Sequence, residues 1–284
     1  MKKAIIYVKR LISSVINNDF FGMASEMSYM SCLGIFPMML FLTGVFSWAG
    51  KHEFLRPVFS FMTSIMPGDS MGLVQTVLHE AIFYNMGGFW AILGFLITLF
   101  LTTNTVAIIS KGLNRAYKIN ETRSFLYTRA MAFLMVCVNT AVLFLAVNLI
   151  IFGKIALIFS VRYLNLGEDI ASLWMFLRWP VAFCALYVMA FLQYYILPDM
   201  KGSELLKLKS TVPGTFFFCT CWLIGSWGFS IYVNNLHTYN FIYGTIGAFA
   251  VLMVWMYYSS ILILVGAEIN SQVYNRLEIS NGNK

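Results

Sequence analysis

Long runs of apolar residues, separated by short polar stretches, make up most of the chain between residues 28 and 267. A helix rises about 1.5 Å per residue, so about 20 mostly apolar residues cross the roughly 30 Å hydrocarbon core of a bilayer. Six runs have this length and predict six transmembrane spans, at approximately residues 28–50, 88–110, 130–152, 173–197, 212–233 and 243–267. We therefore predict an all-α polytopic membrane protein, with residues 1–284 forming a single membrane domain.

Two segments outside these runs have apolar residues at helical spacing instead. Near the N-terminus one helix face would carry Ile5, Val8, Ile12, Val15 and Ile16. Residues 51–87, between spans 1 and 2, are too long for a turn and too apolar for a solvated loop, and they show a similar rhythm. Both segments predict amphipathic helices lying in the membrane plane. We expect the N-terminal helix to be retained, because Lys9 and Arg10 interrupt its apolar run and no small-residue cleavage site follows.

The composition supports a membrane protein and excludes a water-soluble enzyme. The chain is 60% hydrophobic and 11% charged, with a mean hydropathy of +0.75, whereas a soluble domain has about 25% charged residues. Of the 19 Lys and Arg residues, 14 lie in the N-terminal segment, the second and fourth loops and the tail, and the net charge is +7. Basic residues favour the cytoplasmic side, so both termini are predicted to be cytoplasmic. Contact with anionic lipid headgroups accounts for the basic excess without any nucleic acid.

No pattern in the chain predicts a metal site, a cofactor or a disulfide. The five cysteines lie inside apolar runs and read as packing residues, and the three histidines lack a second ligand at metal-binding spacing. Residues 68–72 match G-x-S-x-G, which would make Ser70 a hydrolase nucleophile. That motif requires a preceding strand, whereas the residues before Pro67 read as an amphipathic helix. Ser70 is better explained as a helix cap, and the prediction is that the protein is not an enzyme.

Polar residues gather at the predicted cytoplasmic ends of spans 1, 2 and 6. An ionised side chain at membrane depth costs roughly 2.5–3.5 kcal/mol and is therefore usually paired or functional. The candidates for a cavity or an ion pair are Glu26, Tyr29, Asn104, Asn114, Arg115, Tyr117, Glu268 and Asn270. One interpretation has Glu26, Arg115 and Glu268 lining a cytoplasm-facing polar cavity. The other makes the same residues an interhelical staple at the headgroup level, and the sequence leaves both open.

A further set of residues marks close helix packing or bending. Proline interrupts helical hydrogen bonding, and glycine lets neighbouring backbones approach. The candidates are Pro37, Gly225, Gly228, Gly244 and Gly247. The four glycines lie in spans 5 and 6, so these two spans are predicted to pack together.

Three segments resemble the YihY/BrkB family of bacterial inner-membrane proteins, formerly mislabelled ribonuclease BN. They are MASEMSYMSCLGIFPMMLFLTGVF (23–46), KGLNRAYKINETR (111–123) and FIYGTIGAFAVLMVWMYYSSILILVGAEINSQV (241–273). The resemblance rests on the E-x-x-Y of Glu26 and Tyr29 before an F-P, the N-R-A-Y at residues 114–117, the Tyr-Gly at 243–244 and the G-A-E-x-N at 266–270. Ser25 and Ser28 stand where alanines are commoner. The resemblance implies six spans and an inner-membrane location.

Two functions are compatible with these features. The first is a transporter that moves a lipid or another amphiphile through the cytoplasm-facing cavity. The alternative is a non-transporting membrane scaffold for an envelope partner. Expected partners are membrane lipids, including anionic headgroups on the cytoplasmic side, and an envelope protein or a second copy of the chain. Internal repeats of the kind found in many transporters are not evident in the sequence.

Overall fold

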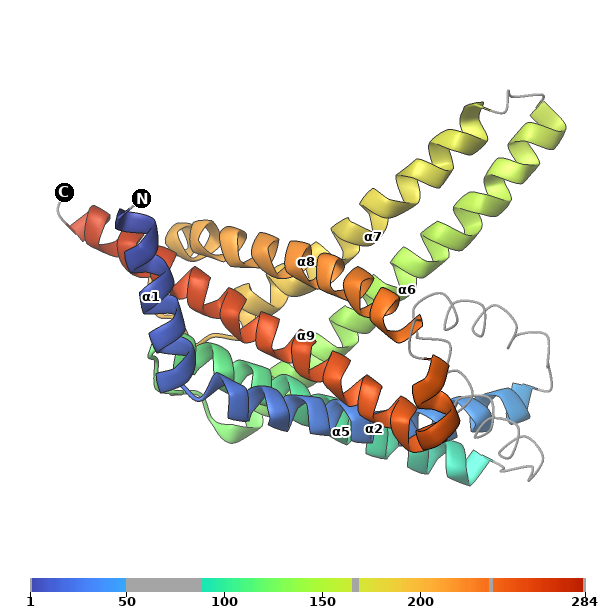
Figure 1. Ribbon diagram of the computed structural model, residues 1–284, viewed down its shortest axis with the longest axis horizontal. Helices are drawn as coiled ribbons and strands as arrows, with labels where there is room; N and C mark the ends of the chain where they lie inside the picture. Colours follow the sequence, from blue (N-terminus) through green and yellow to red (C-terminus); the bar gives the residue numbers. More distant parts are fainter. Residues whose placement is uncertain (1, 50–87, 165–168, 235–236, 283–284) are drawn as a thin grey trace. The chain divides into compact units, whose positions relative to one another are not determined.

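The computed structural model describes residues 2–49, 88–164, 169–234 and 237–282, and these residues form a series of long helices (Figure 1). The helices are α1 (Lys2–Asn17), α2 (Phe20–Ala49), α5 (Gly88–Tyr117), α6 (Phe125–Leu164), α7 (Asp169–Ile196), α8 (Glu204–Asn234) and α9 (His237–Gly282). No strand occurs among the described residues. The predicted all-α class is confirmed.

Five of these helices contain segments that are long and apolar enough to cross a membrane. These segments are Phe89–Tyr117, Phe125–Leu149, Trp179–Ile196, Glu204–Tyr232 and Phe249–Ser280. They overlap five of the six predicted spans, with different bounds, and the chain is a polytopic membrane protein. The remaining predicted span lies within α2, which is helical but is not among the five. The total of six therefore stays a prediction.

Several helices are much longer than the apolar runs that predicted them. The helix α9 has 46 residues, which corresponds to about 69 Å and exceeds the roughly 30 Å hydrocarbon core. Its last turns are polar. Backbone hydrogen bonding in a helix does not require apolar side chains, so the helix continues after the apolar run has ended. The candidate residues Glu268 and Asn270 follow directly on the predicted span 243–267 and lie within the apolar segment Phe249–Ser280.

The predicted N-terminal helix is confirmed as α1. It ends where Asp19 adopts a left-handed backbone conformation, with φ of 54°, which aspartate tolerates better than most residues. The Asp19 carboxylate accepts a hydrogen bond from the backbone N–H of Gly22 at 3.3 Å, in the first turn of α2. The helices predicted within residues 51–87, together with Ser70, lie outside the described residues.

The chain divides into two compact units, each of which is described by itself. The first comprises Met1–Gly112 and Cys221–Val265, and the second comprises Leu113–Thr220 and Gly266–Lys284. In the first unit α5 comes close to α2 at Pro37, because Gly94 has no side chain to separate the two backbones.

The parts of α8 and α9 in the first unit are held together by polar contacts of aromatic residues. Trp222 Nε1 donates to Ser259 Oγ at 2.9 Å, and the Tyr258 hydroxyl donates to the backbone carbonyl of Cys221 at 2.6 Å. The rings of Trp222 and Trp255 lie 5.7 Å apart. These contacts confirm that the last two predicted spans pack together.

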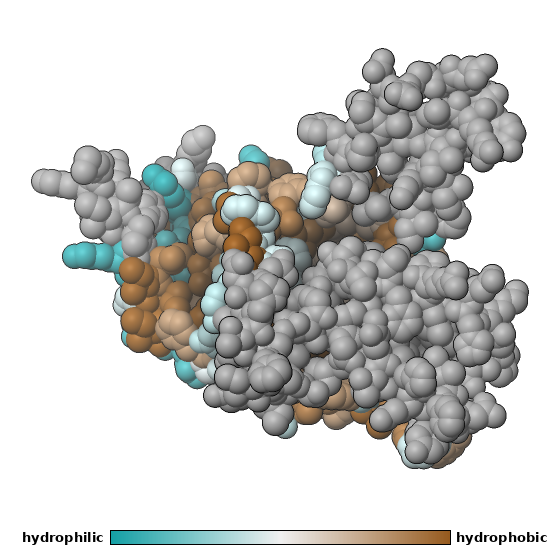
Figure 2. Space-filling model, turned by 45° about the vertical axis from the view of Figure 1, so that its right-hand side comes forward, coloured by the Kyte–Doolittle hydropathy of each residue, from teal (hydrophilic) through white to brown (hydrophobic). Residues whose placement is uncertain are grey.

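In the second unit α6 and α7 run alongside one another (Figure 1). Large apolar side chains remain exposed on the helices, such as Leu126 at 78% and Phe144 at 66%. Hydrophobic residues colour a large share of the described surface visible in Figure 2. Such a surface is unfavourable in water and is expected for helices that face lipid.

Candidate functional site

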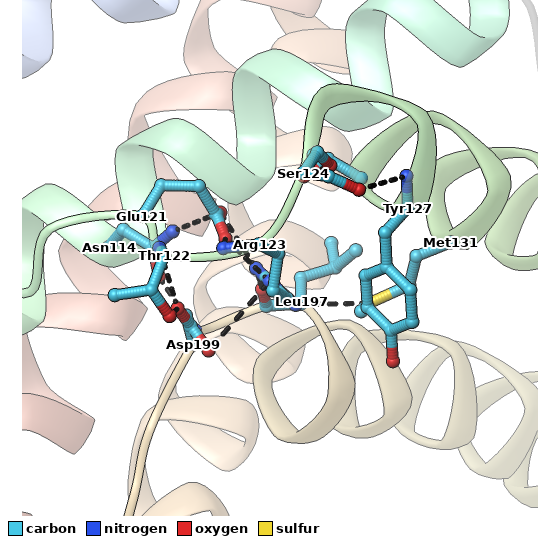
Figure 3. Close-up of polar contacts among 10 residues, drawn as sticks. Asn114, Glu121, Thr122, Arg123, Ser124, Tyr127, Met131, Leu197 and Asp199 are labelled. Carbon is cyan, nitrogen blue, oxygen red and sulfur yellow. Dashed lines mark hydrogen bonds and ion pairs between the residues drawn. The ribbon is translucent and has the colours of Figure 1, made fainter.

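The connection after α5 is built on the buried side chain of Asn114, which is 4% exposed. Its Nδ2 donates to Glu121 Oε2 at 2.7 Å, and its Oδ1 accepts from the backbone N–H of Asp199 at 2.8 Å. Asn114 therefore joins the α5–α6 connection to the α7–α8 connection, two segments far apart in the sequence (Figure 3).

Arg123 makes further bonds between the same two connections. Its Nε and Nη2 donate to the two carboxylate oxygens of Glu121 at 2.6 and 2.8 Å, a bidentate pairing. Nη2 also donates to the backbone carbonyl of Leu197 at 2.7 Å, and Nε lies 3.8 Å from Asp199 Oδ1. The planar guanidinium can make these bonds at once, which a lysine ammonium cannot reproduce.

Asp199 pairs with the loop through Thr122. Its Oδ2 accepts from the Thr122 backbone N–H at 2.9 Å and from the Thr122 hydroxyl at 2.6 Å. We call the group formed by Asn114, Glu121, Thr122, Arg123 and Asp199 the loop network. The hydrogen bond from Thr122 holds the pKa of Asp199 below its ordinary value, and the hydrogen bonds from Arg123 lower the pKa of Glu121.

The end of α5 directs the chain into this network. Lys118 adopts a left-handed conformation with φ of 56°. The backbone N–H of Ile119 donates to the carbonyl of Asn114 at 2.9 Å, and that of Lys118 donates to the carbonyl of Arg115 at 3.1 Å. This pattern is a Schellman motif, which usually has glycine at the left-handed position. The chain uses a lysine there.

A second polar group lies on α9, where Asn270 is fully buried. Its Oδ1 accepts a hydrogen bond from the backbone N–H of Gly214 on α8 at 2.6 Å. A Cβ added at Gly214 would overlap the carbonyl oxygen of Gly266, so the two helices touch at the level of their backbones. Within the described part of the chain, Asn270 Nδ2 has no hydrogen-bond partner.

Glu268 is also buried, with 5% of its surface exposed. Its Oε1 accepts from Gln272 Nε2 at 3.1 Å, while Oε2 has no partner among the described residues. Two residues along a helix correspond to a rotation of about 200°. Glu268 and Asn270 therefore occupy opposite sides of α9 and do not form one group.

Tyr117, the last residue of α5, is a third buried polar residue. It is 7% exposed, and its hydroxyl has no partner in the part of the chain that the structure describes. Its ring meets that of Tyr274 on α9 edge to face, with centroids 6.2 Å apart. Burial of an unpaired hydroxyl is unfavourable, so this position combines aromatic packing with an unused donor.

The other candidates from the sequence have less enclosed positions. Glu26 and Tyr29 on α2 are exposed, Asn104 on α5 is half-buried, and Arg115 is exposed. Glu26 belongs to the first compact unit, whereas Arg115 and Glu268 belong to the second. The ion cluster suggested for these three residues stays a prediction.

The packing candidates also differ from one another. A Cβ at Gly225 would overlap the hydroxyl of Tyr258, whereas a Cβ at Gly228 would meet nothing within 4 Å. Gly247 is buried, and Gly244 lies inside α9. Gly214 and Gly266, which make the closest backbone contact, were not predicted.

The sequence reasoning also missed most of the loop network. Glu121, Thr122 and Arg123 are the last three residues of the KGLNRAYKINETR segment, which the sequence links only to the family resemblance. Asp199 follows Pro198 after α7, with no local sign of its partners. Among the described residues no group of three or more His, Cys, Asp or Glu side chains could hold a metal ion.

Comparison with known proteins agrees with the architecture. The sequence profile of the family described as virulence factor BrkB matches residues 11–284. The chain belongs to the BrkB family. This confirms the resemblance seen in the sequence.

BrkB relatives cover nearly the whole chain. The Bacillus subtilis protein YfkH, whose name describes it as ribonuclease-like, is 27% identical over 98% of both chains. A UPF0761 membrane protein of Pseudoalteromonas atlantica is 23% identical, covering 95% of this chain and 86% of its own. A UPF0761 membrane protein of Vibrio vulnificus is 25% identical, with 96% and 83% covered. No solved structure matches the chain.

Proposed function

We propose that this BrkB protein is a transporter of a lipid or another amphiphile, with Glu268 in a polar cavity open to the cytoplasm. The observation that supports the proposal is the burial of Glu268, of which Oε2 has no partner among the described residues. The apolar helices and the family of membrane proteins fix only the broader setting, an integral membrane protein.

The physical argument starts from the cost of a buried carboxylate. Leaving an acceptor buried and unpaired costs about 1–3 kcal/mol, and more for a charged group. Ionisable residues in membrane-spanning segments are therefore rare, and they mark substrate or ion pathways by default. A carboxylate with one free oxygen is suited to receive a hydrogen-bond donor or a cationic group of a passing substrate.

A vesicle assay tests this proposal. The protein is reconstituted into liposomes containing a fluorescent phospholipid, and dithionite measures the exchange of lipid between leaflets. We expect Glu268→Gln to slow the exchange about tenfold or more, as loss of a charge-assisted hydrogen bond predicts. The matched control is Glu278→Gln, since Glu278 lies on the same helix but is exposed. Its rate should equal that of the wild type.

The opposite result identifies the alternative. If Glu268→Gln folds, exchanges lipid as the wild type does and retains one stoichiometric envelope partner in crosslinking, the protein is a scaffold. Accessibility supplies an independent check, because a cysteine at position 268 must react with a thiol reagent added from the cytoplasmic side. Protection under all conditions contradicts a cytoplasm-facing cavity.

The proposed inner-membrane location and orientation have their own test. Reporter fusions at residue 120 and at the C-terminus should be active only in the cytoplasm, because the basic loops favour that side. An external reporter at either position would place Glu268 on the wrong side of the membrane for the proposed cavity.

A further inference from the structure

A row of four aromatic rings runs along one face of α7. Phe183, Tyr187, Phe191 and Tyr195 follow one another at intervals of four residues, and each ring stacks on the next. The centroid distances are 6.4, 6.1 and 5.9 Å, and the angle between neighbouring rings falls from 29° to 10° along the row. All four side chains are half-buried, so part of each ring remains open.

The row ends in polar groups at Tyr195. The Tyr195 hydroxyl donates to Glu204 Oε2 at 2.5 Å, and the Lys207 ammonium lies 4.9 Å from the centre of the Tyr195 ring. Lys207 forms no ion pair with a carboxylate in the described part of the chain. Its positive charge, held over the ring, is available to an external anion.

The first part of α8 extends the same surface. Phe216 meets Phe183 edge to face at 6.4 Å. One helical face carries Leu208, Val212 and Phe216, exposed by 45%, 45% and 58%. The aromatic row of α7 and this apolar face of α8 therefore form one continuous surface, with Phe183 and Phe216 at one end and Lys207 at the other.

The length of the row matches half of a bilayer. From Phe183 to Tyr195 the helix rises about 18 Å, close to the roughly 15 Å of one hydrocarbon leaflet. The polar end then lies at the level of the lipid headgroups. With the predicted orientation, that leaflet is the cytoplasmic one.

We propose that this surface binds a phospholipid with an anionic headgroup. The phosphate lies at Lys207, and an acyl chain lies along the aromatic row and the apolar face of α8. The charge of Lys207 selects the headgroup, because its ammonium forms no ion pair with a carboxylate among the described residues, whereas the nearby Glu204 carboxylate accepts from the Tyr195 hydroxyl. This site does not depend on the transport proposal, since it contains no residue of α9.

Native mass spectrometry of the detergent-purified protein tests the site. The protein is mixed with phosphatidylglycerol or phosphatidylcholine, and the number of lipids retained per chain is measured. We expect phosphatidylglycerol to be retained preferentially and Lys207→Gln to weaken its apparent affinity about fivefold. The matched control is Lys209→Gln, because Lys209 is exposed and turned about 200° from Lys207 on α8.

The acyl-chain half of the site is tested separately. Phe191→Leu interrupts the row and should reduce retention of both lipids, whereas Phe144→Leu, at an exposed position on α6, should not. Inorganic phosphate at millimolar concentration should not displace phosphatidylglycerol, since it lacks the acyl chain. Equal retention of both lipids by the wild type, or unchanged retention in folded Lys207→Gln, contradicts the site. Neither result bears on whether Glu268→Gln alters lipid exchange.

Discussion

The loop network and the polar residues of α9 follow opposite rules, although both belong to the second compact unit. In the loop network both carboxylates and the arginine are paired, and Asn114 uses both ends of its amide. On α9, Glu268 and Asn270 are also buried, but each has one atom without a partner among the described residues. A satisfied network fixes a structure, whereas an unsatisfied buried group costs stability and is kept where function needs it.

Gly214→Ala should have the largest effect on stability, because it disrupts the close contact between α8 and α9 at which Asn270 accepts its hydrogen bond. The added Cβ would overlap the carbonyl of Gly266 and the amide of Asn270, and backbone atoms cannot move aside without separating α8 from α9. We expect a loss of stability of about 3 kcal/mol, at the upper end for overpacking. The measurement is the midpoint temperature of unfolding in detergent.

The control for this substitution is Gly228→Ala on the same helix. A Cβ at Gly228 meets nothing within 4 Å, so alanine should be neutral or stabilising by up to about 1 kcal/mol through helix propensity. Equal midpoints for the two variants would mean that the backbone contact at Gly214 does not hold Asn270 in place.

Arg123→Ala should have the next largest effect on stability, and it disrupts the loop network. It removes every donor to Glu121 Oε1 except a backbone N–H, and it leaves the carbonyl of Leu197 without this partner. Hydrogen bonds to charged groups contribute about 1.5–3 kcal/mol. We expect the free energy of unfolding to fall by about 2–3 kcal/mol. The loss should be smaller for Arg123→Lys, which keeps the charge but lacks the planar guanidinium.

Lipid exchange distinguishes this loss from a loss of function. Because the loop network is assigned to structure and Glu268 to the transport site, folded Arg123→Lys should exchange lipid at the wild-type rate. A stable Arg123→Lys protein with abolished exchange would place the loop network in the transport mechanism and remove the contrast between the two regions.

The helices could be predicted because apolar length alone determines where a chain crosses a bilayer. The ends could not, since residues such as Lys111 and Asn114 continue α5 beyond the apolar run. Asn114, Glu268 and Asn270 were found because a polar group near membrane depth is conspicuous in the sequence.

The partners of these residues were not predictable, because hydrogen bonds across long sequence separations leave no local pattern. Asp199 lies 85 residues from Asn114 and 77 from Thr122. The approach of Gly214 to Gly266 likewise depends on how α8 crosses α9, which the spacing within either helix does not determine. The sequence placed Glu268 and Asn270 in one group, although the turn of the helix sets them on opposite sides.

Acidification should lower the stability contributed by the loop network, by less than Gly214→Ala or Arg123→Ala does. The pKa values of Glu121 and Asp199 are lowered in the folded protein. These carboxylates therefore stabilise the fold above their ordinary pKa values, and the stabilisation is lost as the pH falls through the lowered ones. We expect the midpoint temperature to fall between about pH 5 and about pH 3, and to fall less in Asp199→Asn. Glu278→Gln, at an exposed carboxylate, should keep the wild-type pH profile.

Lys118→Gly should have the smallest effect, and of opposite sign. Lys118 holds a left-handed conformation at the start of the loop network, which strains a residue with a Cβ but not glycine. The relief exceeds the extra entropy that glycine loses on folding, so we expect a gain of about 0.5–1 kcal/mol. The matched control is Lys111→Gly, which removes the same charge from an exposed position inside α5 and should cost about 1 kcal/mol. If both variants lose stability equally in detergent unfolding, the left-handed conformation at Lys118 is not strained, and the explanation for the end of α5 is contradicted.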